Sequence, residues 1–116
     1  MKKTILDIQT KKKNNQKITM LTAYDYPMAR LVDSVGIDIV LVGDSLANVV
    51  LGLDSTKKVT MQDMLYHTRA VKRAVKDALI IGDMPYEAYQ LNCSRAVSSA
   101  KEFIASGCDA VKLEFM

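Results

Sequence analysis

The sequence predicts an α/β fold in which helices cover a parallel β-sheet, and three features of its pattern lead to this fold class. Four short apolar runs rich in Ile, Val and Leu recur along the chain, at residues 18–22, 38–42, 78–83 and 109–114. They show little alternation of polar and apolar residues, as expected of parallel strands that are buried on both faces. The segments between them carry apolar residues at helical spacing. Such strands are joined by right-handed crossovers.

The chain is expected to begin with a helix over residues 4–13, before the strand at 18–22. Asp25 can cap the next helix, Pro27 favours its first turn, and Gly36 ends it. The face of this helix that is expected to point inward carries Met28, Leu31, Val32 and Val35. This helix connects the first strand to the second.

The second strand, 38–42, is followed by an extended loop over residues 44–59 and then by another helix. Thr60 and Asp63 are spaced as a capping box at the start of that helix. Its inward face is expected to carry Met61, Met64, Leu65, Thr68, Val71 and Val75. Long structured loops after parallel strands are common places for function.

The third strand, 78–83, is followed by a helix that Ser94 can start and Gly107 ends. Its inward face is expected to carry Ala96, Val97, Ala100, Phe103 and Ile104. The last strand, 109–114, completes the order helix, then β-α-β-α-β-α-β.

The composition excludes several classes of protein. Hydrophobic residues make up 49% and charged residues 25% of the sequence, which is typical of one globular domain spanning residues 1–116. The net charge of +3 comes largely from N-terminal lysines without interleaved aromatic residues, so we expect a solvated surface and no nucleic-acid binding. No run reaches the roughly 20 apolar residues of a membrane span, and no secretory signal is evident, so we expect a cytoplasmic protein. The spacing of Cys93, Cys108 and the single His67 predicts neither a zinc site nor a disulfide.

An acidic residue follows or ends each predicted strand. Asp25 follows the first strand, Asp44 the second, Asp83 ends the third and Glu114 the fourth. The carboxyl ends of parallel strands meet at one edge, where ligands bind in α/β folds. Each acid also has a structural explanation, since helix capping explains Asp25 and turn chemistry can explain Asp44, Ser45 and Asp83.

The last strand carries two charges that packing does not explain. Val111 and Leu113 suit a face covered by helices, whereas Lys112 and Glu114 must point the other way, into the interior if the sheet curls into a barrel. Buried charges are costly unless they are paired or bound to metal. Three carboxylates without histidine or thiolate suit a hard cation such as Mg²⁺. A small anionic ligand such as a 2-oxo acid would then bind beside Lys112.

A second hypothesis assigns Lys112 a different chemistry. A lysine on an inward strand can be the Schiff-base nucleophile of a metal-independent aldolase. The nearby acids favour Mg²⁺ over this alternative.

Five stretches carry a family resemblance: "TAYDYPMARLVD", "IDIVLVGDSLANVVLGLDST", "VTMQDMLYHTRAV", "IIGDMPY" and "GCDAVKLE". In this order the sequence closely resembles the ketopantoate (3-methyl-2-oxobutanoate) hydroxymethyltransferase family. The resemblance implies a (β/α)₈ TIM barrel, here a partial barrel of about four parallel strands with an N-terminal helix. It also implies that intact members are cytoplasmic homo-oligomers.

The resemblance implies a reaction and its components. Family members transfer a hydroxymethyl group from 5,10-methylenetetrahydrofolate to 3-methyl-2-oxobutanoate, giving 2-dehydropantoate for pantothenate biosynthesis, with Mg²⁺ as cofactor. By matching motifs, the implied metal ligands are Asp44, Asp83 and Glu114. The implied contacts to the 2-oxo acid are Asp44, Ser45, Asp83 and Lys112. His67 lies on a predicted helix, and its position predicts a structural role.

The resemblance also implies that this chain lacks a catalytic residue, because the family's general-base glutamate lies in the second half of the barrel, beyond residue 116. A complete barrel takes roughly 250 residues. Phe115 and Met116 stand where the family continues with glycine, so we expect a truncated or frameshifted reading frame. An alternative to the transferase is therefore an inactive fragment, or a complementing half-barrel without turnover.

Overall fold

The computed structural model describes residues 1–114, so the prediction that rests on Phe115 and Met116 lies outside the described residues. The sheet has four parallel strands in sequence order: β1 (Met20–Thr22), β2 (Ile39–Val42), β3 (Leu79–Asp83) and β4 (Ala110–Lys112). The longer helices are α1 (Ile5–Lys13), α2 (Tyr26–Ser34), α4 (Met61–Ala74) and α6 (Cys93–Ala105). The α/β class and the predicted order of these elements are confirmed.

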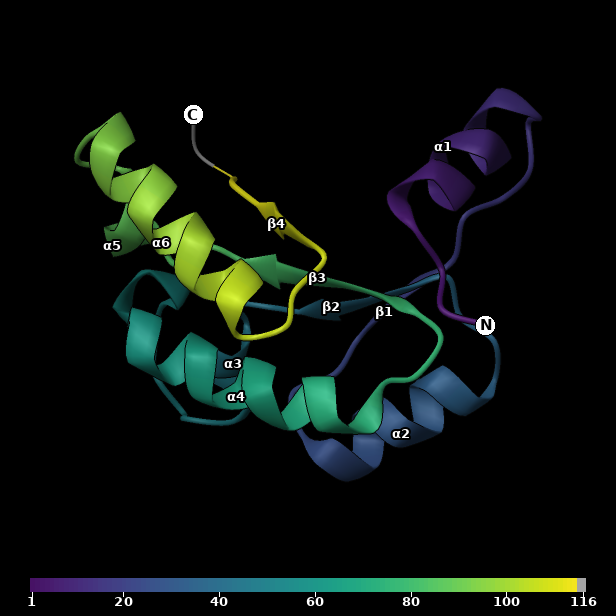
Figure 1. Ribbon diagram of the computed structural model, residues 1–116. Helices are drawn as coiled ribbons and strands as arrows, with labels where there is room; N and C mark the ends of the chain where they lie inside the picture. Colours follow the sequence, from purple (N-terminus) through teal and green to yellow (C-terminus); the bar gives the residue numbers. More distant parts are fainter. Residues whose placement is uncertain (115–116) are drawn as a thin grey trace.

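The helices α2, α4 and α6 form a row along one face of the sheet, with α4 between the other two (Figure 1). The helix α1 stands apart from this row, and none of its residues is buried. No helix among residues 1–114 has the length and apolar character needed to cross a membrane.

The ends of the helices follow the local sequence signals closely. The Asp25 carboxylate accepts the Met28 N–H at 2.9 Å at the start of α2, and Thr60 and Asp63 form the predicted capping box of α4. The predicted start at Ser94 is wrong, because Asn92 caps α6 through the Arg95 N–H at 2.8 Å. Asparagine is as good a capping residue as serine, which explains why the helix can begin two residues earlier than predicted.

The core lies between the sheet and the row of helices. Val40 and Ile80 of the sheet pack with Met64, Val71 and Phe103 of the helices, and all five are fully buried. A Cβ at residue 82 would lie 2.5 Å from the Phe103 ring, so Gly82 is what lets α6 approach β3 this closely. This contact fixes α6, and with it β4, beside the end of β3.

The predicted inward faces of the two outer helices are partly wrong. Ala29 and Val32 of α2 are buried, but the exposed fractions of Leu31 and of Val35, which follows the helix, are 60% and 69%. Other predicted core residues that are about half exposed are Met28, Val97 and Ile104. The reason is that, within the described residues, α4 is the only long helix that flanks each outer helix of the row. The edge strand β1 is likewise exposed along its whole length.

The predicted extended loop over residues 44–59 has more structure than expected. It contains α3 (Leu46–Val49) and a 3₁₀ turn, η1 (Thr56–Lys58), while a further short helix, α5 (Tyr86–Tyr89), follows β3. Leu46, Ala47 and Val59 are fully buried and tie the segment to the core. The residues that follow β2 are therefore held in place.

Candidate functional site

The carboxyl edge of the sheet brings together Asp44, Asp83, Lys112 and Glu114, which we call the carboxyl-edge cluster. Asp83 is at its centre and is only 5% exposed. Its Oδ2 accepts the backbone N–H of Asp44 at 2.9 Å, and its Oδ1 lies 3.0 Å from Lys112 Nζ. Lys112 Nζ is also 3.7 Å from Glu114 Oε2, so the two charged residues at the end of the chain's last strand form an ion pair.

Strand register and one glycine create this arrangement. Asp83 and Lys112 are directly paired between β3 and β4, which places their side chains on the same face of the sheet. A Cβ at residue 43 would lie 3.0 Å from Ser45 Oγ and 3.3 Å from Thr22 Cγ2. Gly43 therefore leaves room for the turn after β2 to carry Asp44 and Ser45 close to β1 and β3.

The carboxylates of the cluster lie close enough to perturb one another. Burial, followed by the negative charges of Asp83 and Glu114, raises the pKa of Asp44 to about 6, although Lys112 opposes the shift. Burial alone would lower the pKa of Lys112, but its hydrogen bond to Asp83 and the surrounding carboxylates raise it instead. Lys112 is therefore a firmly held ammonium group beside three mutually repelling acids.

The donor set of the cluster suits a hard divalent cation, because its carboxylates supply only oxygen ligands. Within residues 1–114, no three His, Cys, Asp or Glu side chains already stand in an arrangement that holds a metal ion. Lys112 contacts one oxygen of Asp83, and the side chain of Glu114 is 54% exposed. The cluster therefore fits a cation in its chemistry, and Glu114 has the freedom to turn towards one.

Two residues that the sequence did not single out as site residues connect to Ser45. The Tyr24 hydroxyl lies 2.7 Å from Ser45 Oγ, and the Tyr24 carbonyl oxygen lies 2.7 Å from His67 Nδ1. The signal that could have found Tyr24 is its place just after β1, matching that of Asp44 after β2. Asp25, by contrast, caps α2 as predicted.

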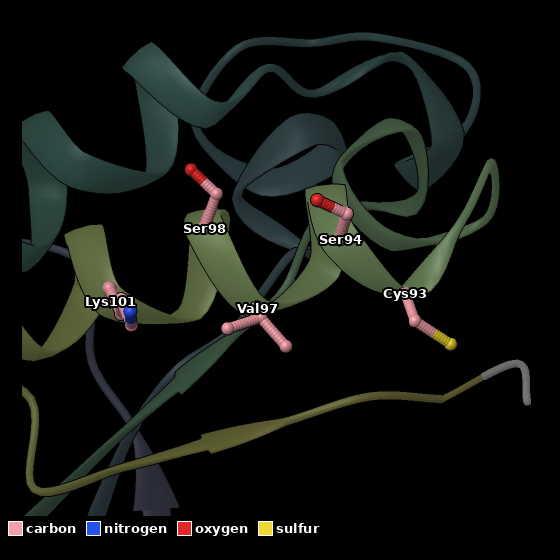
Figure 2. Close-up of a pocket in the computed structure, with 5 residues that line it drawn as sticks. All are labelled: Cys93, Ser94, Val97, Ser98 and Lys101. Carbon is pink, nitrogen blue, oxygen red and sulfur yellow. The ribbon is translucent and has the colours of Figure 1, made fainter.

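A hollow of about 530 Å³ lies elsewhere, along α6 (Figure 2). Its lining residues are Cys93, Ser94, Val97, Ser98 and Lys101. None of the predicted site residues lines it. It lies on the half-exposed face of an outer helix, so we do not assign the candidate site to it.

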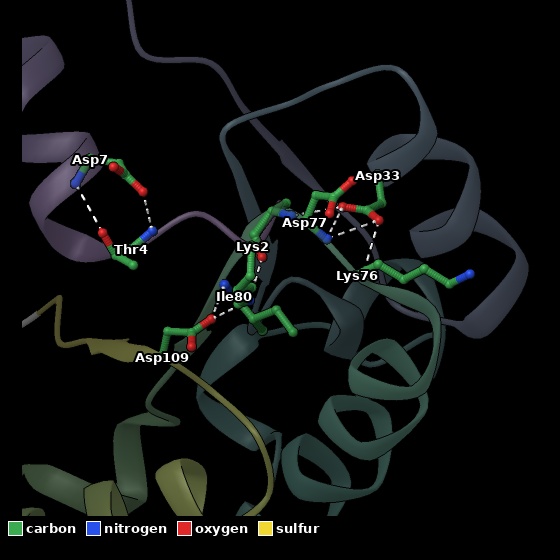
Figure 3. A network of polar contacts seen from close by, with 9 residues as sticks. Lys2, Thr4, Asp7, Asp33, Lys76, Asp77, Ile80 and Asp109 are labelled. Carbon is green, nitrogen blue, oxygen red and sulfur yellow. Dashed lines mark hydrogen bonds and ion pairs between the residues drawn. The ribbon is translucent and has the colours of Figure 1, made fainter.

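The amino edge of the sheet carries a different acidic network (Figure 3). Asp109 Oδ2 accepts the Ile80 N–H at 2.8 Å and lies 2.7 Å from Lys2 Nζ. Asp33 accepts backbone N–H groups of the segment before β3, those of Lys76, Asp77 and Ala78. These carboxylates join neighbouring elements to one another.

Asp38, also at the amino edge, is 1% exposed and just precedes β2. Its carboxylate lies 2.9 Å from Lys11 Nζ and accepts the backbone N–H of Thr19 at 2.9 Å. Lys11 thereby fastens α1 to the sheet.

Comparison with known sequences identifies the family to which the chain belongs. The sequence pattern of the ketopantoate hydroxymethyltransferase family matches residues 2–116. The chain belongs to this family. The 3-methyl-2-oxobutanoate hydroxymethyltransferase of Ignicoccus hospitalis is 56% identical over 115 residues, which are 98% of this chain and 44% of that protein. The enzyme of the same name from Syntrophomonas wolfei is 54% identical over 112 residues, or 96% of this chain and 41% of that one.

The family member described here spans less than half the length of these relatives. Among solved structures, phosphoenolpyruvate phosphomutase from Streptomyces platensis is similar, with a TM-score of 0.76 and 18% sequence identity. The match covers 96% of this chain and 38% of that one. It supports the predicted fold class, part of a (β/α)₈ barrel.

Proposed function

We propose that this chain provides the metal and 2-oxo acid half-site of a 3-methyl-2-oxobutanoate hydroxymethyltransferase. The observation that carries the proposal is the gathering of Asp44, Asp83, Lys112 and Glu114 at the edge where parallel barrels bind ligands. Membership of the family supports the reaction: hydroxymethyl transfer from 5,10-methylenetetrahydrofolate to 3-methyl-2-oxobutanoate, giving 2-dehydropantoate.

In this proposal Asp44, Asp83 and Glu114 hold Mg²⁺. An ion held there would supply Lewis-acid polarisation of the ketone of the oxo acid, which would acidify the adjacent C–H. Lys112 places a positive charge beside the substrate carboxylate, and the Ser45 hydroxyl donates to a substrate oxygen. In this proposal the proton acceptor is a glutamate that is not among residues 1–116. Cytoplasmic location and homo-oligomeric assembly stay predictions.

The contacts of Lys112 argue against the Schiff-base alternative. A Schiff-base lysine must be neutral to attack a carbonyl. Lys112 Nζ lies 3.0 Å from Asp83, and its pKa is raised rather than lowered. Borohydride treatment with 3-methyl-2-oxobutanoate should therefore leave Lys112 unmodified, as measured by mass spectrometry. A covalent adduct on Lys112 would instead favour the aldolase chemistry.

Calorimetric titration with 3-methyl-2-oxobutanoate tests the proposed half-site. We expect binding that requires Mg²⁺ and that Asp83→Asn weakens by more than about tenfold. Asp54→Asn is the matched control, because it removes the same charge from an exposed side chain that pairs with Lys58. Binding that is indifferent to both Mg²⁺ and Asp83→Asn would overturn the proposal.

A second candidate, a complementing half-barrel without turnover, is favoured by exposed apolar side chains on the edge strand β1 and on the outer helix α6. Met20 and Leu21 on β1 are about half exposed, as are Val97 and Ile104 on α6. The test mixes the chain with a separately produced polypeptide that carries the C-terminal remainder of the Ignicoccus hospitalis relative. Turnover by the mixture alone supports this candidate, and turnover by the unmixed chain refutes it.

A further inference from the structure

Tyr24, Ser45 and His67 form a chain of hydrogen bonds that joins the segments after β1 and β2 to α4, beside the carboxyl-edge cluster. The Tyr24 hydroxyl lies 2.7 Å from Ser45 Oγ, and its carbonyl oxygen lies 2.7 Å from His67 Nδ1. Tyr24 therefore connects α4, the middle helix of the row, to a residue of the proposed substrate site. None of the roles proposed above explains this connection.

The Ser45 side chain does not form the local capping hydrogen bond that its position would allow. Ser45 occupies the residue before α3, where serine usually caps a helix, yet its side chain caps no N–H group of the described chain. Instead Ser45 Oγ faces the Tyr24 hydroxyl. A Cβ at residue 43 would lie 3.0 Å from Ser45 Oγ and 3.7 Å from Asp83 Oδ2, so Ser45 stands next to the cluster.

The chemistry of the groups sets the direction of the hydrogen bonds. A carbonyl oxygen only accepts, so His67 Nδ1 must carry the proton and donate it to Tyr24. A phenol is a stronger acid than an aliphatic alcohol, so the Tyr24 hydroxyl is the better donor of the pair. Ser45 then accepts from Tyr24, and its own proton stays available for a ligand oxygen.

We propose that Tyr24 and His67 are positioning residues that orient the Ser45 hydroxyl as a hydrogen-bond donor to the anionic 2-oxo acid; this inference rests on the proposed function. His67 fixes the backbone of Tyr24, and the Tyr24 hydroxyl donates to a lone pair of Ser45 Oγ, which leaves the Ser45 O–H to donate to another acceptor. Ser45 thereby becomes a donor without reorganisation when the ligand binds.

The test measures calorimetric binding of 3-methyl-2-oxobutanoate in the presence of Mg²⁺. We expect Tyr24→Phe and Ser45→Ala each to weaken binding about fivefold, the value of one net hydrogen bond. The double variant should be no weaker than Ser45→Ala alone, because the two residues act through one group. Tyr66→Phe, which removes the hydroxyl of an exposed tyrosine on α4, is the matched control and should bind normally.

The positioning role of His67 is tested by comparing a substitution that keeps an N–H donor with one that removes it. His67→Asn keeps an N–H donor near the position of Nδ1, so it should bind like the unmodified chain, whereas His67→Ala should bind about as weakly as Tyr24→Phe. A role in stability alone would be detected as a lower melting temperature without this difference in binding. Nitrogen NMR should find the His67 proton on Nδ1.

The outcomes separate this inference from the proposed function. If the unmodified chain binds no oxo acid, the proposed function fails and the inference fails with it. If it binds and Ser45→Ala weakens binding, but the Tyr24→Phe effect is absent or simply adds to that of Ser45→Ala, only the positioning role fails. A His67 proton on Nε2 also overturns the positioning role, whatever the binding result.

Discussion

Acidic side chains lie at both edges of the sheet, but they have different partners. At the amino edge, Asp33 and Asp38 accept backbone N–H groups, and Lys11 pairs with Asp38. Burial alone would raise the pKa of each carboxyl, but the hydrogen bonds outweigh it and lower both pKa values. At the carboxyl edge, burial and neighbouring carboxylates raise the pKa of Asp44 to about 6.

The difference separates acids whose hydrogen bonds stabilise the fold from acids that we propose bind a ligand. A carboxyl with a lowered pKa adds stability at neutral pH, and a carboxyl with a raised pKa removes it. Clusters of the second kind are found at functional sites more often than elsewhere. We therefore expect the acids at the amino edge to stabilise the folded sheet, and we propose that the acids at the carboxyl edge take part in the chemistry.

Removing Asp38 should have the largest effect on stability. We expect Asp38→Ala to lower the free energy of unfolding by about 3 kcal/mol at pH 7, because it leaves a partly buried ammonium and the Thr19 N–H without their partner. Denaturant unfolding measures the change. Asp54→Ala, at an exposed side chain, is the control. Equal losses in the two variants would remove the distinction between the edges.

Removing Asp33 should have the next largest effect. Asp33→Ala takes away the acceptor of three backbone N–H groups before β3, and we expect a loss of about 2 kcal/mol. Because the pKa of Asp33 is lowered, its contribution is present above pH 3.8 and disappears as the pH falls below that value. The loss caused by the substitution should therefore shrink in acid, and a constant loss would show that the carboxylate charge is irrelevant.

The sequence predicted the elements well because their signals are local. Apolar runs and capping residues such as Asp25 and Thr60 act within a few positions, and the structure confirms them. Burial was predicted less well, as Leu31 and Val35 show, because burial depends on which neighbours an element has. A helical stripe indicates that a face can be covered and does not identify what covers it.

The candidate site shows the same division between features that local sequence predicts and features that depend on tertiary contacts. The alternation along β4 and the acids after β2 and β3 predicted that Lys112 would lie with Asp44 and Asp83, because parallel strands end at a common edge. The sequence could not predict that the Tyr24 hydroxyl contacts Ser45, or that His67 contacts the Tyr24 carbonyl. Tyr24 and Ser45 are separated by 21 positions along the chain, and Tyr24 and His67 by 43 positions. The distance between such residues is set by the tertiary fold.

Neutralising Asp44 should stabilise the chain, which is the opposite of the effect at the amino edge. Between pH 3.8 and about 6 the folded chain binds a proton at Asp44 that the unfolded chain releases, so stability falls as the pH rises through this range. We expect Asp44→Asn to gain about 1 kcal/mol at pH 7 after allowance for solvent screening, and nothing below pH 3.8. Denaturant unfolding over a pH series measures this, and a loss at pH 7 would contradict it.

The smallest expected effect links Lys112 to Asp44. The ammonium of Lys112 lowers the pKa of Asp44, in opposition to burial and to the other carboxylates. Lys112→Gln removes this positive charge, so the pKa of Asp44 should rise above about 6, by a fraction of a unit because the groups are partly solvated. NMR titration of the Asp44 carboxyl carbon measures the shift, with Lys101→Gln on α6 as the control. An unchanged pKa would show that Asp44 does not sense Lys112, and the carboxyl edge would then lack the electrostatic coupling that distinguishes it from the amino edge.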